Sequence, residues 1–139
     1  MFPFATRILI VDDLESLRGL LKAYLQRIGF RAIDEAFDGQ NALDMLWEAE
    51  HVKAPYGVVI SDWNMPNMTG LDLLLRVRQV TAWKTLPFIL LTTESEKDKI
   101  VSAVTAGVSN YMVKPVEEVM LREKLTKVWE KKQKASAGP

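Results

Sequence analysis

Apolar residues along the chain follow two different periodicities in alternation. Short, continuous apolar runs occur at 7–11, 58–60, 88–92 and 111–113, with a weaker run around Ala32 and Ile33. Runs of this length fit strands that are covered on both faces, as in parallel sheets. In the intervals between them, apolar residues recur every three or four positions, which is typical of one face of a helix.

Five helices are expected in these intervals. The clearest begins near Leu17 and ends at Ile28, and Gly29 follows as its C-terminal cap. The others are expected near 42–49, 71–79, 100–108 and 116–131, with a loop carrying Trp83 at 81–87. Residues of the N-cap type precede three of them, namely Asp38, Thr69 and Ser95. This order predicts an α/β, doubly wound, five-stranded parallel sheet with helices on both faces and right-handed crossovers.

Size and composition narrow the function classes. A length of 139 residues suits one domain, placed at 1–131, and the polar segment 132–139 is expected to be a disordered tail. Eighteen basic and eighteen acidic residues give a net charge of zero, which offers no electrostatic reason to expect nucleic-acid binding. No cysteine is present for disulfides or cysteine-based zinc sites. The sequence contains no apolar run of the ~20 residues that a membrane span needs and no secretion signal, so a cytoplasmic protein is expected.

Polar residues with chemical potential stand where the predicted strands end. Asp12 and Asp13 follow the first strand, Asp62 the third, Thr92 the fourth and Lys114 the fifth. Carboxyl ends of parallel strands share one edge of the sheet, where ligands bind in such folds. Carboxylates gathered there repel one another unless a cation neutralises them, and Mg²⁺ prefers such hard oxygen ligands. The sequence therefore predicts a magnesium site at this edge.

A lysine and a hydroxyl beside such a site suit a phosphoryl group, and Asp62 could accept one as a nucleophile or simply ligate the metal. Other phosphate chemistry lacks its motif, because neither GxxxxGK[ST] nor GxGxxG occurs. The single histidine, His51, lies in a polar stretch and is expected at the surface. Strand-end residues of this kind also occur as ordinary caps and turns, so the pattern as a whole carries the prediction.

The motifs resemble those of the receiver domains of two-component response regulators, most closely the single-domain chemotaxis regulators. The resemblance covers about residues 7–131. It is carried by Val11-Asp12-Asp13, by the run 62–68 (DWNMPNM), by Leu91-Thr92-Thr93-Glu94 and by the run 107–115 (GVSNYMVKP). It implies the flavodoxin-like strand order 2-1-3-4-5 and a monomeric signalling protein that is not a conventional enzyme, although it assists its own phosphorylation and dephosphorylation.

The resemblance also assigns roles to individual residues. Asp62 would be the phosphoacceptor. Asp13, Asp62 and the backbone carbonyl of Asn64 would ligate Mg²⁺, and Asp12 would hold a coordinated water.

Three further residues would respond to phosphorylation of Asp62. Lys114 would pair with the phosphoryl oxygens and Thr92 would move toward them. Tyr111 would then turn inward. The chain departs from the family pattern at Thr93, which could narrow access to Asp62, and also at Thr69, Val108 and Asn110.

By the same resemblance, the donor would be a histidine kinase and the output partner a flagellar motor switch protein. A single-domain phosphorelay intermediate is the main alternative. An aspartate-nucleophile phosphatase is a remote one, because Asn64 stands where such enzymes carry an acid/base Asp. An inactive receiver would be expected to lack Asp13, Asp62 or Lys114, and all three are present.

Overall fold

The computed structural model, which describes residues 1–93 and 97–137, confirms the predicted doubly wound α/β fold. One parallel sheet has the strand order β2-β1-β3-β4-β5, as the family resemblance implied. Its strands are β1 (Arg7–Val11), β2 (Ala32–Ala36), β3 (Val58–Asp62), β4 (Phe88–Thr92) and β5 (Asn110–Val113).

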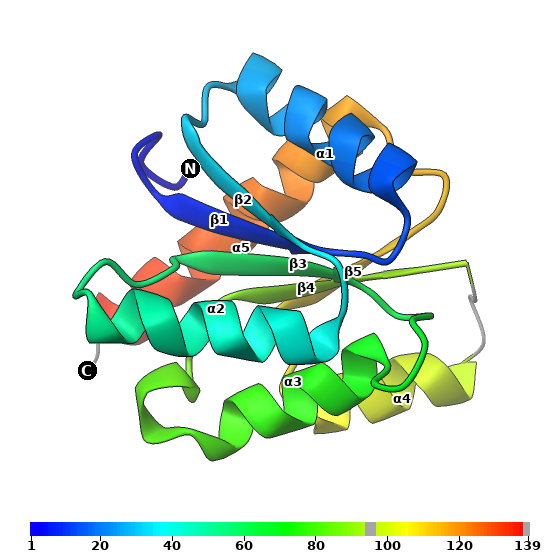
Figure 1. Cartoon of the computed structure of the whole chain (residues 1–139). Helices are drawn as coiled ribbons and strands as arrows, with labels where there is room; N and C mark the ends of the chain where they lie inside the picture. The colour runs from blue at the N-terminus through cyan, green and yellow to red at the C-terminus, as the bar shows by residue number, and fades with distance from the viewer. Residues whose placement is uncertain (94–96, 138–139) are drawn as a thin grey trace.

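Helices cover both faces of this sheet (Figure 1). On one face lie α1 (Glu15–Ile28) and α5 (Glu118–Ala137). On the other lie α2 (Gly39–His51), α3 (Gly70–Gln79) and α4 (Lys97–Thr105). Within the described residues, none of these helices is both long and apolar enough to cross a membrane.

The apolar strand runs are explained by two cores, one on each face of the sheet. Ile8 and Ile10 of β1 belong to the core under α1 and α5, whereas Leu9 and Val11 belong to the core under α2 and α3. All four side chains are almost completely inaccessible to solvent. Successive residues of a strand point to opposite faces, so a strand covered on both sides must be apolar throughout. In the three central strands β1, β3 and β4, polar residues therefore occur only at or next to the ends, whereas the edge strand β2 carries Asp34 and Glu35 in its middle.

The predicted caps are confirmed where the structure describes them. Asp38 accepts a hydrogen bond of 2.7 Å from the backbone N–H of Asn41 at the start of α2. Thr69 and Asp72 form a reciprocal capping box at the start of α3, with both bonds at 3.1 Å. Gly29 ends α1 with φ of 130°, a left-handed conformation that glycine tolerates. The predicted cap Ser95 lies outside the described residues.

Three boundary predictions are wrong. Helix α5 continues past Lys131 to Ala137, where a disordered tail was expected, because residues 131–137 (KKQKASA) are mostly good helix formers and glycine comes only at 138. Helix α4 ends at Thr105, so Val108 lies outside it, beyond a glycine at 107 with φ of 90°. The predicted loop at 81–87 opens with a short 3₁₀ helix, η1 (Thr81–Trp83), whose Trp83 is buried.

Gly70→Ala should destabilise the protein. A β-carbon at position 70 would lie 2.2 Å from the backbone carbonyl oxygen of Asp62, which cannot move without shifting the end of β3. Such overpacking costs roughly 1–3 kcal/mol of unfolding free energy. Urea unfolding measures the loss.

Gly19→Ala is the matched control for this substitution. Gly19 is exposed within α1 and has no atom within 4 Å of the added carbon. It should gain roughly 0.5–1 kcal/mol, because alanine favours the helix. Equal stability of the two variants would contradict the close approach at Gly70.

Candidate functional site

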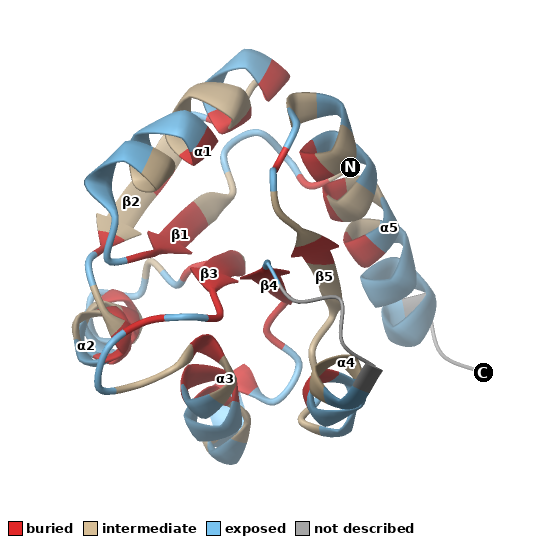
Figure 2. Cartoon of the chain, turned by 90° about the vertical axis from the view of Figure 1, so that its right-hand side faces the viewer, coloured by how far each residue is buried: buried red, intermediate tan, exposed pale blue. Residues whose placement is uncertain are grey.

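Four buried polar residues interrupt an otherwise apolar core: Asp12, Ser61, Asp62 and Thr92. All four lie at or beside the carboxyl ends of the three central strands, at the sheet edge that faces the viewer in Figure 2. The exposed Asp13 follows Asp12 directly. The structure therefore gathers the predicted site residues at the predicted edge.

The three aspartates form a compact acidic cluster. Asp12, Asp13 and Asp62 each offer a carboxylate oxygen, and these oxygens all lie within 4.8 Å of one another. Asp12 and Asp62 are buried, whereas Asp13 is open to solvent. Like charges at this separation repel strongly when water cannot screen them, so the cluster is costly without a counter-charge.

This electrostatic cost is reflected in the pKa of Asp12. Burial raises its pKa from 3.8 to about 6, and repulsion from Asp62 adds to the rise, although a backbone N–H bond and the charge of Lys114 oppose it. Its Oδ1 accepts that bond from Leu14 at 2.8 Å, while its buried Oδ2 has no hydrogen-bond partner among the described residues. Because the folded state binds this proton more tightly than the unfolded chain does, metal-free stability should fall as pH rises from about 4 to about 6.

Lys114 supplies one counter-charge. Its Nζ lies 2.8 Å from Oδ1 of Asp62, and the two side chains are only 19% and 4% exposed. Among the described residues, no hydrogen bond to Asp62 Oδ1 accompanies this ion pair. The backbone N–H of Lys114 donates to the carbonyl of Thr92 at 2.8 Å, which ties the end of β5 to that of β4.

Further residues that the sequence did not single out fix the site. Ser61 Oγ donates to the carbonyl of Asp62 at 2.9 Å, and Gly70 lets α3 approach that same carbonyl. Arg18 Nη1 donates to the carbonyl of Asp12 at 2.7 Å, and its Nε reaches Glu35 at 3.2 Å. Arg18 lies in the first turns of the helix predicted after Asp12. This closeness in sequence to Asp12 was the only feature that could have marked it as a site residue.

These residues fit Mg²⁺. The possible ligand atoms are carboxylate oxygens, which Mg²⁺ prefers. The buried Oδ2 of Asp12 has no hydrogen-bond partner among the described residues, and a metal-bound water would supply one. Asn64 lies two residues after Asp62 in the exposed part of the following loop. Its backbone carbonyl remains the proposed third protein ligand.

The two residues predicted to respond to phosphorylation, Thr92 and Tyr111, lie on the neighbouring strands β4 and β5. Thr92, at the end of β4, is buried, and Thr93 beyond it is exposed. Tyr111 on β5 is half-buried, and its ring centre lies 5.5 Å from Nζ of Lys124. Asn110 Oδ1 accepts from both the Tyr111 N–H and the Lys124 ammonium, at 2.8 and 3.3 Å.

Comparison with known proteins agrees with this geometry. The model of the response regulator receiver domain matches residues 8–126. The chain belongs to the response regulator receiver domain family. It is 42% identical over 125 residues to the chemotaxis protein CheY-3 of Vibrio cholerae, covering 90% of this chain and 92% of that one. The same identity and length relate it to the chemotaxis protein CheY of Pseudomonas aeruginosa, covering 97% of that protein.

Solved receiver structures share the fold. The chain aligns with chemotaxis protein CheY4 of Vibrio cholerae at a TM-score of 0.79 and 35% identity, covering 89% of this chain and 98% of that one. A two-component response regulator from Clostridium difficile aligns at a TM-score of 0.78 and 25% identity, covering 90% and 96%. The chain is thus a CheY-like receiver domain of a two-component signalling system.

Mg²⁺ should stabilise the folded protein. A cation that binds only the folded state adds about 1.4 kcal/mol at ten times its Kd, or a rise in Tm of about 3–6 °C. Thermal unfolding with and without millimolar Mg²⁺ measures this shift. Asp13→Asn should remove most of it, whereas Asp72→Asn, in the α3 capping box, should lower Tm equally with and without the metal. An unchanged Tm in the wild-type protein would contradict the metal site.

Proposed function

We propose that the chain is a phosphorylation-activated response regulator of a chemotaxis-type two-component system. Asp62 accepts a phosphoryl group from a histidine kinase, and the modification changes a surface that docks a protein partner. The ion pair between Asp62 and Lys114 beside the acidic cluster is the observation that carries this proposal. The buried carboxylate is held by a rigid strand end and paired with a cation that suits phosphoryl oxygens.

The chemistry follows from the residues at the sheet edge. A carboxylate oxygen of Asp62 attacks phosphorus, the bond from phosphorus to the donor's imidazole nitrogen breaks, and the imidazole leaves with the electron pair. Asp13, Asp62 and the Asn64 carbonyl would hold Mg²⁺, with Asp12 holding a bound water, and the ion would offset the charge that gathers on the phosphoryl oxygens. Lys114 would pair with one of these oxygens, and its contact of 2.8 Å with Oδ1 of Asp62 supports this role. Hydrolysis of the acyl phosphate later restores the carboxylate.

Binding of the protein partner depends on β5. Lys114 follows its last residue and contacts Asp62, while Tyr111 lies within it. Thr92 moves toward the new phosphoryl group, and Tyr111 turns inward. The surface formed by α4, β5 and α5 then binds a flagellar motor switch protein more tightly. The regulator acts as a monomer, and both phosphorylation and binding take place in the cytoplasm. Such coupling is worth ~1–3 kcal/mol, or about 5–150-fold in affinity.

Asp62 should be the residue that a small acyl-phosphate donor labels. The product is a mixed anhydride, so hydroxylamine should release the label, which a phosphoester would resist. Asp62→Asn should abolish labelling because it removes the nucleophile and keeps the shape. Asp44→Asn, an exposed aspartate on α2, should label normally. Intact-mass measurement checks all three proteins, and persistent labelling of Asp62→Asn would overturn the assignment.

Lys114→Arg should separate phosphorylation from output. Asp62 and the metal ligands remain, so the variant should still accept the phosphoryl group. The planar guanidinium cannot reproduce the ammonium contact at 2.8 Å, so coupling to β5 should weaken. The measurement is affinity for the motor switch protein of the same organism, with and without phosphorylation. Lys22→Arg on α1 is the control, and a full phosphorylation-dependent gain in Lys114→Arg would disprove the link.

A further inference from the structure

The α2–β2 groove is a hollow of about 410 Å³ between α2 and the edge strand β2. One wall belongs to α2 and its C-terminal cap, where the lining residues recur at helical spacing: Asp44, Met45, Glu48, Ala49 and Val52. The other wall is formed by Asp34 of β2, Arg7 of β1 and Tyr56, which precedes β3. Figure 2 shows β2 and α2 together at the left margin of the molecule, and no described strand lies beyond β2. The groove therefore opens at the side of the fold.

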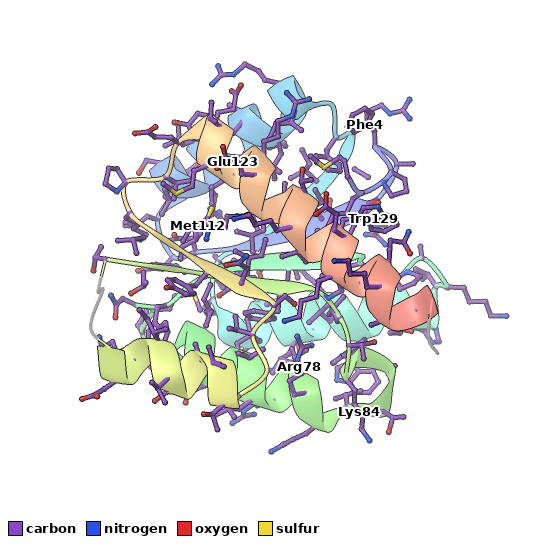
Figure 3. All side chains as sticks on the ribbon, turned by 180° about the vertical axis from the view of Figure 1, so that it is seen from behind. Phe4, Arg78, Lys84, Met112, Glu123 and Trp129 are labelled. Atoms are coloured by element: carbon purple, nitrogen blue, oxygen red, sulfur yellow. The ribbon has the colours of Figure 1, made fainter. Side chains whose placement is uncertain are left out.

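This groove is separate from the phosphorylation site and from the surface formed by α4, β5 and α5. None of its described lining residues belongs to those three elements or to the acidic cluster. Arg7 begins β1, whereas Asp62 ends β3 at the other edge of the sheet. Figure 3, the view from behind, shows the labelled Glu123 and Trp129 of α5 in front of the sheet, on the face opposite to α2. A ligand in the groove would therefore contact neither of these surfaces.

The charges on the wall opposite α2 are paired with each other. Arg7 Nη2 donates to Oδ2 of Asp34 at 2.8 Å and to the hydroxyl of Tyr56 at 3.1 Å, and that hydroxyl donates to the same Oδ2 at 2.6 Å. Arg7 Nη1 donates to the carbonyl of Ala54, and the guanidinium lies 4.3 Å from the ring centre of Tyr56. Burial acts to raise the pKa of Asp34, but the hydrogen bonds from Tyr56 and Arg7 hold it below its ordinary value. This wall is therefore held by several contacts, and its two charges offset each other.

The α2 wall, in contrast, carries negative charge without a cationic partner. Asp44 and Glu48 are exposed and lie four residues apart, a spacing at which like charges on a helix repel. Neither forms an ion pair within the described residues, and Asp44 Oδ1 accepts a hydrogen bond of 3.0 Å from the neutral amide of Gln40. Glu48 also lies in the last turn of α2, where the helix dipole disfavours a negative charge. A cation bound at this wall would relieve both effects.

Apolar surface lies beside these carboxylates. Val52 is 54% exposed and Met45 is half-buried, while the buried Ala49 and Tyr56 also line the groove. A ligand that fits must therefore combine positive charge with an apolar side chain. Nucleic acids and anionic lipid headgroups carry negative charge, so the carboxylates of this wall would repel them. Charge complementarity thus favours a basic, partly apolar segment of a protein.

We propose that the α2–β2 groove binds a short basic segment of a protein partner. Two lysine or arginine side chains of that segment pair with Asp44 and Glu48, and an apolar side chain packs against Met45 and Val52. Asp44 and Val52 are about 12 Å apart along the helix axis, the length of two turns, which suits a short helical peptide. Binding here does not depend on phosphorylation, because the groove does not include Asp62 or the residues that contact it.

The test uses the full chain and a fluorescent peptide that carries lysines four residues apart with leucines between them. The matched probe replaces each lysine by glutamate. Anisotropy should show saturable binding of the basic peptide only, and binding should weaken as salt rises. Methyl NMR should place the largest shift changes at Met45, Ala49 and Val52. Equal binding of both peptides, no saturation, or shift changes centred elsewhere would overturn the proposal.

Neutralising the two carboxylates on α2 gives the sharpest comparison. Asp44→Asn with Glu48→Gln should weaken the basic peptide about fivefold or more, because it removes both charge pairs. Glu123→Gln with Glu130→Gln makes the same change of net charge at exposed positions of α5 that do not line the groove, and should have a much smaller effect. Equal losses in the two variants would mean that net charge, not the groove, attracts the peptide.

Replacing Val52 tests the apolar contact. Val52→Asn should weaken the basic peptide about threefold, because it removes apolar surface that the peptide buries. Val119→Asn, at another exposed valine that lies on α5 outside the groove, should bind normally. Both side chains are mostly exposed, so the unfolding free energy should change little in either variant. Equal binding by the two variants would disprove the apolar contact with Val52.

Other destinations of the peptide and other occupants of the groove are separated by three controls. Asp13→Asn and Asp62→Asn should bind the peptide normally, and a loss there would place the peptide at the acidic cluster and overturn the proposal. A second copy of the chain offers its own basic segment, residues 131–134 (KKQK). Sedimentation at rising concentration should show a monomer, and association that Asp44→Asn with Glu48→Gln abolishes would assign the groove to a second copy instead. These outcomes do not depend on whether the proposed phosphotransfer is correct.

Discussion

Repulsion among three carboxylates at the end of a buried sheet is the constraint on which this molecule depends. Asp12 and Asp62 are almost fully buried, and Asp13 brings a third charge within 4.8 Å. Such a cluster is tolerable only where cations offset it. Lys114 supplies one at 2.8 Å, and the donor set is suited to Mg²⁺. Adding a phosphoryl group changes this balance locally, so the residues that hold the cations are well placed to sense it.

The fold supports this arrangement because the three central strands carry polar residues only at or next to their ends. Two apolar cores bury the strands from both sides, so the carboxylates have no route to solvent except at the edge. The carbonyl of Asp62 is held by Ser61 and approached closely by Gly70, which fixes the end of β3. Under the proposed function, a new charge at Asp62 would therefore act on the neighbouring side chains, and through Lys114 on the end of β5.

Sequence reasoning predicted most of the fold, since apolar runs and helical periods report burial directly. It also predicted that Asp12, Asp13, Asp62 and Lys114 lie at one edge of the sheet, because the carboxyl ends of parallel strands share an edge whatever the details of packing. It missed the true end of α5, where helix propensity outweighed the polar composition of residues 131–137. It could not predict that Arg18 would join the carbonyl of Asp12 to Glu35, because that contact links residues of β1, α1 and β2 only through the fold.

The most direct test of the account is the titration of Asp12 itself. Carbon-detected NMR of the side-chain carboxyl follows its protonation in the metal-free protein and again with saturating Mg²⁺. The account predicts a pKa of about 6 without metal, raised by burial and by Asp62, and a clear fall when Mg²⁺ neutralises the cluster. A metal-free value near 3.8, unchanged by Mg²⁺, would show that the cluster carries no unrelieved charge and would contradict the account.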